Sequence, residues 1–195
     1  YARQCAPLTA SMVEQYTRLF NYPTQGCKKT KEDLPALGIK TWFCSDVCAA
    51  YKRTAYDKAG GFAKHAIFNE DMLIASKFIE MGYSISYVAE ARVIHSHNYT
   101  LSEQFKRNFD LGVSHAQNRE VFSSVPAMGE GIRLVTGTFQ YLLGQKMYLD
   151  LLDLVFQSSA KFFGFWLGKH FAFIPKKLLR ICTANIGYFE SENID

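Results

Sequence analysis

Two neighbouring acidic residues, Glu70 and Asp71, follow Asn69 at the start of a segment with the apolar spacing of a helix. A carboxylate at a loop–helix junction can act as a general base that takes a proton from an attacking hydroxyl group. The simpler interpretation is that both acids interact with the positive end of the helix dipole, worth roughly 0.3–1 kcal/mol each. Because that position favours the charged form, we expect the pKa of Asp71 to be lowered.

A second candidate is the pair His95 and His97, which follows a predicted strand. Residues two apart on an extended segment point to the same side, so both imidazoles are expected to face one region. They could together ligate a metal ion, or one could contact metal or phosphate while the other packs. Simple packing of both rings is the alternative that the sequence leaves open.

The dipeptide Gly60-Gly61, followed by Phe62, comes after a short predicted helix. It lacks the spacing of a dinucleotide-binding loop, so it is interpreted as a helix stop with positive φ unless the loop also lines a substrate cleft. Cys44 and Cys48 are expected on one face of a strand as small buried side chains. The five cysteines include no C-x-x-C pair, which argues against a disulfide framework and favours a reducing compartment.

The composition is typical of a folded chain. Of its 195 residues 48% are hydrophobic, which excludes a disordered tail, and no apolar run is long enough for a transmembrane helix. The formal net charge of +4 is too small to argue for nucleic acid as a partner.

The pattern predicts alternating helices and strands. Helices are expected over 8–20 (capped by Thr9 or Ser11), 52–59, 69–82 and 100–117, strands over 41–51, 84–88 and 92–95, and a loop over 24–38. Asn69 is expected to cap its helix, and Thr100 with Glu103 forms a capping box. By composition, residues 123–131 are expected to form a joint, and the chain is expected to divide into 1–118 and a largely helical 119–195.

The second part is basic and aromatic. Lys161 to Tyr188 contains no acidic residue but five lysines or arginines, interleaved with residues such as Phe163 and Trp166. This composition is typical of a helix on an anionic membrane surface. A helical appendage packed on the catalytic core, or a contact between two copies in a homodimer, would explain it equally well.

The order of these motifs resembles one enzyme family. It runs from Phe43-Cys-Ser-Asp-Val-Cys through Gly60-Gly61-Phe62 and Asn69-Glu70-Asp71-Met72 to His95-Ser-His-Asn-Tyr-Thr100. In this it resembles the C-terminal half of inverting family 2 glycosyltransferases with the α/β GT-A (Rossmann-like) fold. It is most similar to bacterial rhamnosyltransferases that use dTDP-L-rhamnose, and this likeness extends to Leu19-Phe-Asn-Tyr-Pro23.

The resemblance implies roles for the candidate residues. Asp71 would deprotonate the acceptor hydroxyl, Glu70 would shape the acceptor side, and His97 or His95 would reach the metal or the donor diphosphate. The implied substrate-binding residues are Asp46, Gly60, Gly61, Phe62 and Asn69; a role for Asp46 is not assigned beyond its expected place on a strand facing the cleft.

The resemblance also implies a Mg²⁺ or Mn²⁺ ion, a nucleotide-sugar donor, and a glycan or lipid-linked acceptor at the inner face of the cell membrane. The sequence contains no Asp-x-Asp metal motif and begins Tyr-Ala-Arg-Gln, so we expect a piece of a longer enzyme with little activity alone. The principal alternative is a non-catalytic membrane-surface or scaffolding module. A metal-dependent hydrolase built on Asp71 and the histidines fits poorly, because no further ligand set with hydrolase spacing is present.

Overall fold

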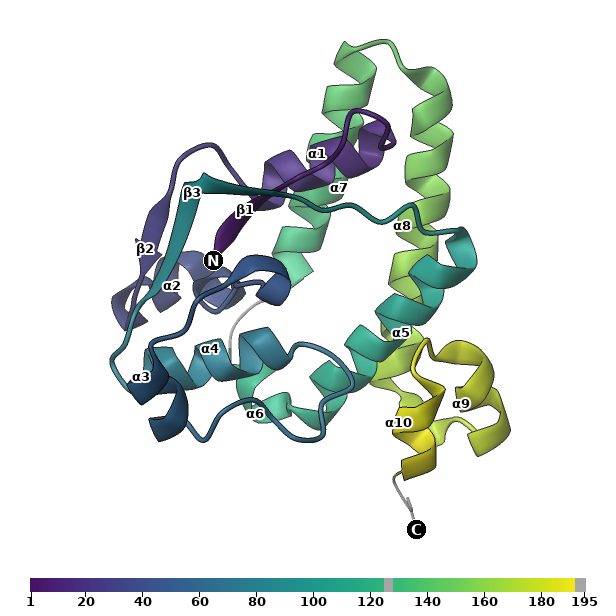
Figure 1. The fold of residues 1–195 in the computed structure, drawn as a ribbon. Coiled ribbons are helices and arrows are strands. Elements are labelled where there is room, and N and C mark those ends of the chain that lie inside the picture. The colour runs from purple at the N-terminus through teal and green to yellow at the C-terminus, as the bar shows by residue number, and fades with distance from the viewer. Residues whose placement is uncertain (125–127, 192–195) are drawn as a thin grey trace.

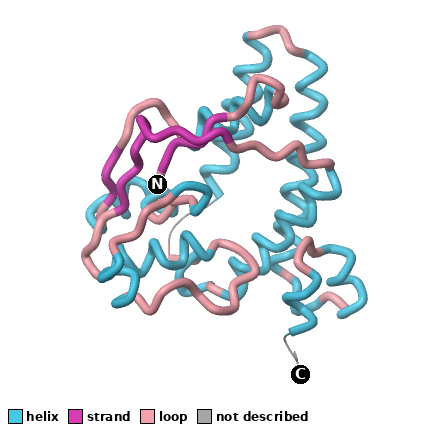
Figure 2. The backbone as a smooth tube through the Cα atoms, viewed as in Figure 1, coloured by secondary structure: helices cyan, strands magenta, loops and turns pink. Residues whose placement is uncertain are grey.

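The computed structural model describes residues 1–124 and 128–191 as a mixed α/β chain (Figure 1). Its small sheet contains β1 (Ala2–Cys5), β2 (Cys27–Lys29) and β3 (Ile85–Ile94) in the order β1-β3-β2. β1 runs parallel and β2 antiparallel to β3, which is therefore central. Figure 2 shows that helices and loops make up most of the remainder.

The helices follow the predicted spacing closely. Their bounds are α1 Met12–Asn21, α2 Leu34–Leu37, α3 Arg53–Lys58, α4 Glu70–Glu80, α5 Leu101–Gln117, α6 Arg119–Phe122, α7 Met128–Gly144, α8 Tyr148–Lys169, α9 Lys176–Cys182 and α10 Ile186–Ser191. Ser11 Oγ caps α1 by accepting from Glu14 N at 3.2 Å, and the Thr100–Glu103 capping box is formed. Gly60 and Gly61 have φ of 80° and 72°, as expected after α3.

The strand predicted over 41–51 is wrong. This segment forms the short 3-10 helices Gly38–Thr41 and Asp46–Cys48 with irregular chain between them. Trp42 and Cys44 are buried, which explains the strand-like apolar pattern, but no neighbouring strand pairs with them. Cys48 is exposed, so only Cys44 of that pair behaves as a small buried side chain.

Three smaller expectations also need correction. The loop predicted over 24–38 contains β2, the 3-10 helix Lys31–Asp33 and α2, and the two strands predicted over 84–95 are one continuous strand, β3. Gly129 and Gly131 lie inside α7, whereas residues 125–127 of the predicted joint lie outside the described residues. All five cysteines are free thiols, as predicted.

The core around α4 positions the first half of the chain. Trp42 and Cys44 pack with Ala75 and Ile79 of α4 and with Ile85 of β3. Lys29 of β2 is also buried, and its Nζ donates to the carbonyl oxygen of Lys40 at 2.8 Å and to that of Phe43. The irregular segment 38–48 is thus held between the sheet and α4.

Helices α5 and α8 pack side by side through glycines (Figure 1). A Cβ atom at Gly168 would overlap the carbonyl oxygen of Phe109, and one at Gly112 would overlap that of Phe165. Gly164 meets Phe105 in the same way. These contacts place the two backbones closer than ordinary side chains would allow.

No helix in the described part of the chain is both long and apolar enough to span a bilayer. The division at residue 118 stays a prediction. α8 packs on α5 and α7 packs on α1, so the described helices on either side of that position are in contact.

Candidate active site

Asp71 lies in the first turn of α4 and is largely removed from solvent. Its Oδ1 accepts a hydrogen bond from the backbone N–H of Met72 at 2.7 Å. Among the described residues, Asp71 forms no salt bridge. Its carboxylate is therefore free of a cation that would suppress its basicity.

The expectation of a lowered pKa for Asp71 is wrong. Burial raises the pKa to about 6, and the charges of Asp46 and Glu70 raise it further, whereas hydrogen bonds from the backbone of Met72 and Asp46 lower it. Loss of solvent outweighs the helix end here. A carboxylate with this pKa is ionised at neutral pH yet basic enough to accept a proton from an alcohol in a transition state.

Asp46 reaches the same neighbourhood from the 3-10 helix Asp46–Cys48 and not from a strand, and its side chain is exposed. Tyr51 Oη donates a hydrogen bond to Asp46 Oδ1 and lies 3.8 Å from Cys44 Sγ. Cys44 Sγ in turn donates to the carbonyl oxygen of Asp71 at 3.5 Å. These contacts connect the irregular segment to the start of α4.

Asn69 precedes α4 in the left-handed conformation, with φ of 64°. Its buried side chain does not cap α4, contrary to expectation, and instead Nδ2 donates to Ser114 Oγ of α5 at 3.4 Å. Ser114 Oγ donates to the carbonyl oxygen of Phe68 at 2.8 Å. Asn69 thus anchors the turn that presents Glu70, which is exposed, and Asp71.

The glycine loop forms part of an aromatic cluster. Phe62 packs edge-on against Tyr51 and Tyr56, with ring centroids 5.6 and 5.3 Å apart. Tyr56 Oη accepts from Phe62 N at 3.3 Å, and a Cβ at Gly61 would approach the Tyr56 ring to 3.2 Å. Tyr51 therefore links this loop to Asp46.

The two histidines lie just after β3 and face one region, as predicted, and their rings contact each other with centroids 4.4 Å apart and perpendicular planes. The His97 ring stacks on the ring of Tyr99, with centroids 4.7 Å apart. The guanidinium of Arg107 from α5 lies over the Tyr99 ring, 5.6 Å from its centroid. Burial, followed by positive neighbours including Arg18 and Arg107, lowers the pKa of both histidines. Both imidazoles are therefore neutral at pH 7.

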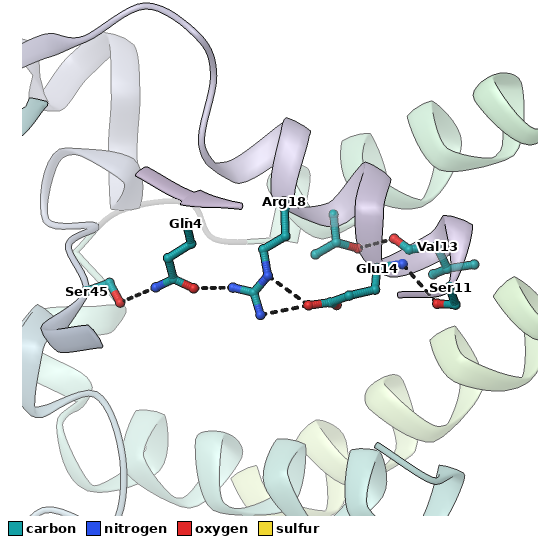
Figure 3. A network of polar contacts seen from close by, with 7 residues as sticks. Gln4, Ser11, Val13, Glu14, Arg18 and Ser45 are labelled. Atoms are coloured by element: carbon teal, nitrogen blue, oxygen red, sulfur yellow. Dashed lines mark hydrogen bonds and ion pairs between the residues drawn. The ribbon is translucent and has the colours of Figure 1, made fainter. Parts of the chain in front are cut away.

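A polar network that sequence analysis missed joins β1 and α1 to the irregular segment 38–48 (Figure 3). Gln4 is buried and donates from Nε2 to Ser45 Oγ at 2.6 Å, while Arg18 Nη1 donates to Gln4 Oε1. Arg18 also forms a salt bridge with Glu14 at 2.7 Å. The i,i+4 spacing of Glu14 and Arg18 was a usable signal for this pair, but nothing in the sequence indicated Gln4 as its partner.

The structure groups the predicted residues into two clusters. Asp71 lies near Asp46, and His95 contacts His97, but no hydrogen bond or salt bridge between described residues joins Asp71 to either histidine. Burial lowers the pKa of both histidines, and the charge of Arg18 lowers it further. Burial raises the pKa of Tyr22; the charge of Arg18 opposes that shift and the charge of Asp71 adds to it.

The described residues do not form a metal site. Among them, no group of three or more histidine, cysteine, aspartate or glutamate side chains is arranged to hold a metal ion. The His95–His97 pair can offer at most two nitrogen ligands, fewer than a bound divalent cation requires. The metal implied by the resemblance would need further ligands, and no chemical step is assigned to it.

A half-buried carboxylate with a raised pKa and, in a separate cluster, neutral imidazoles close to arginine charges are suited to a transferase that deprotonates an alcohol and binds an anionic leaving group. The chain is 40% identical to the O-antigen chain rhamnosyltransferase WbaN of Salmonella anatum and 39% identical to RfbN of Salmonella typhimurium strain LT2. Each similarity covers 98% of this chain and 63% of the relative, so the chain spans less than two thirds of the relatives' length. No family model and no solved structure matches the chain.

Proposed function

We propose that this chain carries the acceptor side of a rhamnosyltransferase site in cell-surface polysaccharide synthesis. The reaction would transfer L-rhamnose from dTDP-L-rhamnose, with inversion, to a glycan or lipid-linked glycan. The observation that carries the proposal is the coincidence of a general base of suitable pKa with similarity to named rhamnosyltransferases over 98% of the chain. A GT-A arrangement of the family 2 type is part of the proposal.

In this mechanism the proton of the acceptor hydroxyl moves to the Asp71 carboxylate. The acceptor oxygen forms a bond to the anomeric carbon while the bond from that carbon to the diphosphate oxygen breaks. The electron pair of the broken bond leaves with dTDP. Because one displacement occurs on the face opposite the leaving group, the anomeric configuration inverts.

The histidine cluster would receive the leaving group. Arg18 and Arg107 place positive charge near His95 and His97, and the neutral imidazoles can donate N–H hydrogen bonds to phosphate oxygens. Such preorganised donors stabilise charge as it develops in the transition state. In this proposal the donor sugar and the acceptor hydroxyl meet between Asp71 and the two histidines.

The decisive experiment replaces the base. In a full-length enzyme that contains this chain, Asp71→Asn should lower kcat by about 10²- to 10⁴-fold, the usual contribution of general base catalysis, with dTDP-L-rhamnose binding unchanged. Asp57→Asn is the control, because Asp57 forms only an exposed i,i+4 ion pair with Arg53. Rates within about tenfold of the unmodified protein for Asp71→Asn would refute the assignment of Asp71 as the base.

Folding can be separated from chemistry in the same variant. The pKa of Asp71 is about 6 in the folded protein, against an ordinary value of 3.8 in the unfolded chain, so the folded state binds more protons between these values. Stability from this group is present at low pH and is lost as pH rises through 6. At pH 7 the neutral asparagine should therefore fold at least as stably, so inactivity would not be due to unfolding.

A second function is favoured by the exposed side chains at the end of the chain. The basic aromatic surface consists of Phe162, Phe163, Trp166, Phe173, Leu178 and Ile181 with Lys169, Lys176, Lys177 and Arg180. Phe173 is 86% exposed and Phe162 is 64% exposed, which is unusual for a surface without an apolar partner. We propose that this surface rests on an anionic membrane, where a lipid-linked acceptor would be located.

Point variants test the membrane proposal better than deletion, because removing residues 146–195 would also remove α8 from α5. Phe173→Ser combined with Lys177→Glu should lower sedimentation with anionic vesicles, and added salt should lower it further. Lys64→Glu, at an exposed position of the loop before α4, is the charge control. Equal sedimentation of all three proteins would exclude this surface as the contact.

A further inference from the structure

A cavity of about 430 Å³ lies beside His97, between the start of α1 and the middle of α8. Its lining comes from the start of α1, the segment 97–100 and the middle of α8, and it does not include Asp71. Every lining residue except Val13 carries a polar group on its side chain, although α8 elsewhere exposes leucine and phenylalanine. A volume of this size is in the range of small-molecule sites.

The wall formed by α8 is a stripe of polar residues. Asp153, Gln157 and Lys161 are spaced four residues apart, so they lie on one face of the helix and all line the cavity. The exposed residues Leu152, Phe156 and Phe163 lie beside this stripe in the sequence but do not line the cavity. The polar side chains on this face of α8 require polar partners, whereas the apolar side chains beside them do not.

The protein itself leaves part of this stripe without partners. Gln157 Nε2 donates to Asp153 Oδ1 at 3.4 Å, but Gln157 Oε1 is buried and has no hydrogen-bond partner. Among the described residues no hydrogen bond or salt bridge holds Lys161, and burial lowers its pKa. A buried amide oxygen is normally satisfied, so the unpartnered Gln157 Oε1 of a residue that lines this cavity indicates a bound ligand.

The charges of the lining indicate what ligand would fit. Glu14 and Asp153 are carboxylates, whereas Lys161 is cationic and His97 is neutral at pH 7. Glu14 is paired with Arg18, and Asp153 and Lys161 carry opposite charges, so the lining offers no excess of positive charge to a diphosphate. Carboxylate, amide and ammonium groups together instead match the donors and acceptors of vicinal hydroxyl groups. The lining therefore favours a neutral polyhydroxylated molecule.

We propose that this cavity binds one neutral hexopyranose residue of the glycan acceptor through Asp153, Gln157 and Lys161. The proposal rests on the proposed function and adds a subsite to it, remote from the base. It gives α8 a role in selecting the acceptor. The reacting hydroxyl would belong to a neighbouring part of the same glycan, because Asp71 does not line this cavity.

The test is ligand-observed NMR on the protein with a panel of methyl α-hexopyranosides of gluco, galacto, manno and rhamno configuration. We expect at least one member to bind, and Gln157→Met to weaken that binding by about 3- to 10-fold, as for loss of one hydrogen bond. Methionine keeps the length of the side chain but removes the amide. Gln140→Met, at an exposed position of α7, is the matched control and should bind as the unmodified protein does.

A second variant guards against misfolding. Thr9 is exposed and lines the cavity, so Thr9→Trp should block the cavity and abolish sugar binding while the melting temperature is maintained. Binding that survives both Gln157→Met and Thr9→Trp would overturn the proposal.

The outcome is separable from that of the proposed function. A protein that binds dTDP-L-rhamnose and transfers rhamnose, but binds none of the four glycosides, retains the proposed function and loses this subsite. A protein that binds a glycoside in the cavity but does not transfer rhamnose has the opposite result.

Discussion

The pKa values shift in opposite directions, but for the same causes, in the carboxylate cluster (Asp46, Glu70 and Asp71) and the histidine cluster (His95 and His97). At Asp71, burial and the negative charges of Asp46 and Glu70 raise the pKa to about 6. At His95 and His97, burial and the positive charges of Arg18 and Arg107 lower the pKa. In each cluster burial is the largest cause and like charges act in the same direction as burial.

In both clusters the pKa shifts favour the uncharged form of the side chain. The result is a base that is not locked in an ion pair and imidazoles that can donate hydrogen bonds without carrying charge. α5 contributes to both clusters, because Ser114 holds Asn69 and Arg107 lies beside Tyr99. A change that moves α5 should therefore disturb both clusters together, whereas a local change should affect only one.

The largest effect is expected from Gly168→Ala, which moves α5 by forcing α8 away from Phe109. Overpacking at such a contact costs about 1–3 kcal/mol, so thermal unfolding should show a clearly lower melting temperature. Gly131→Ala in α7 is the control, because nothing lies within 4 Å of the added methyl group and alanine favours a helix. Equal melting temperatures for the two variants would contradict the close α5–α8 contact.

A smaller effect, confined to the carboxylate cluster, is expected at Asn69. Asn69→Ala removes the hydrogen bond to Ser114 and places a methyl-bearing residue at φ of 64°, which costs about 1–2 kcal/mol. Asn69→Gly loses the same hydrogen bond but accepts the backbone conformation without strain. Denaturant unfolding should therefore rank alanine below glycine, and the reverse order would argue against the left-handed turn.

Asp46→Asn tests the electrostatic effect of Asp46 on Asp71 alone, and its effect on the rate is expected to be smaller still. The rate of the unmodified protein is expected to rise with pH through about 6, as Asp71 loses its proton. Without the Asp46 charge the pKa of Asp71 falls, so this rise should move to lower pH. Measurement of kcat/KM against pH tests the shift; Glu70→Gln should give a smaller one, because its charge is the lesser cause.

The smallest expected effect is a shift at the histidine cluster in Arg18→Gln. Removal of this positive charge should raise the pKa of His95 and His97, which NMR titration of the imidazole protons would detect. Arg53→Gln, on the exposed surface of α3, should leave both titrations unchanged. Unchanged histidines in Arg18→Gln would mean that the network of Figure 3 does not connect to them.

Local signals predicted much of this structure. Ser11 and the Thr100–Glu103 pair begin their helices as expected, and the His95–His97 contact follows from strand geometry. These features depend on residues within a few positions of each other. The predicted chemistry of Asp71, His97 and the loop residues stays a prediction, since none of the contacts described here includes a substrate.

The failures arose where distant residues decide the outcome. Trp42 and Cys44 are buried like strand residues, but α4 and β3 provide their neighbours, and no strand lies within pairing distance. The pKa of Asp71 depends on burial by the folded chain, which a helix-end argument does not include. Gln4 and Ser45 meet across the fold, at a sequence separation that no short pattern records.

Lys29 offers a way to observe the segment that carries Asp46. Burial lowers its pKa to about 8, and its amine contacts the carbonyl oxygens of Lys40 and Phe43. Above that pH the side chain is a neutral, nucleophilic amine that is only 4% exposed. An acylating reagent at pH 9 would label surface lysines at once but would reach Lys29 only when residues 40–43 open. The labelling rate of Lys29 would thus measure how often residues 40–43 open locally.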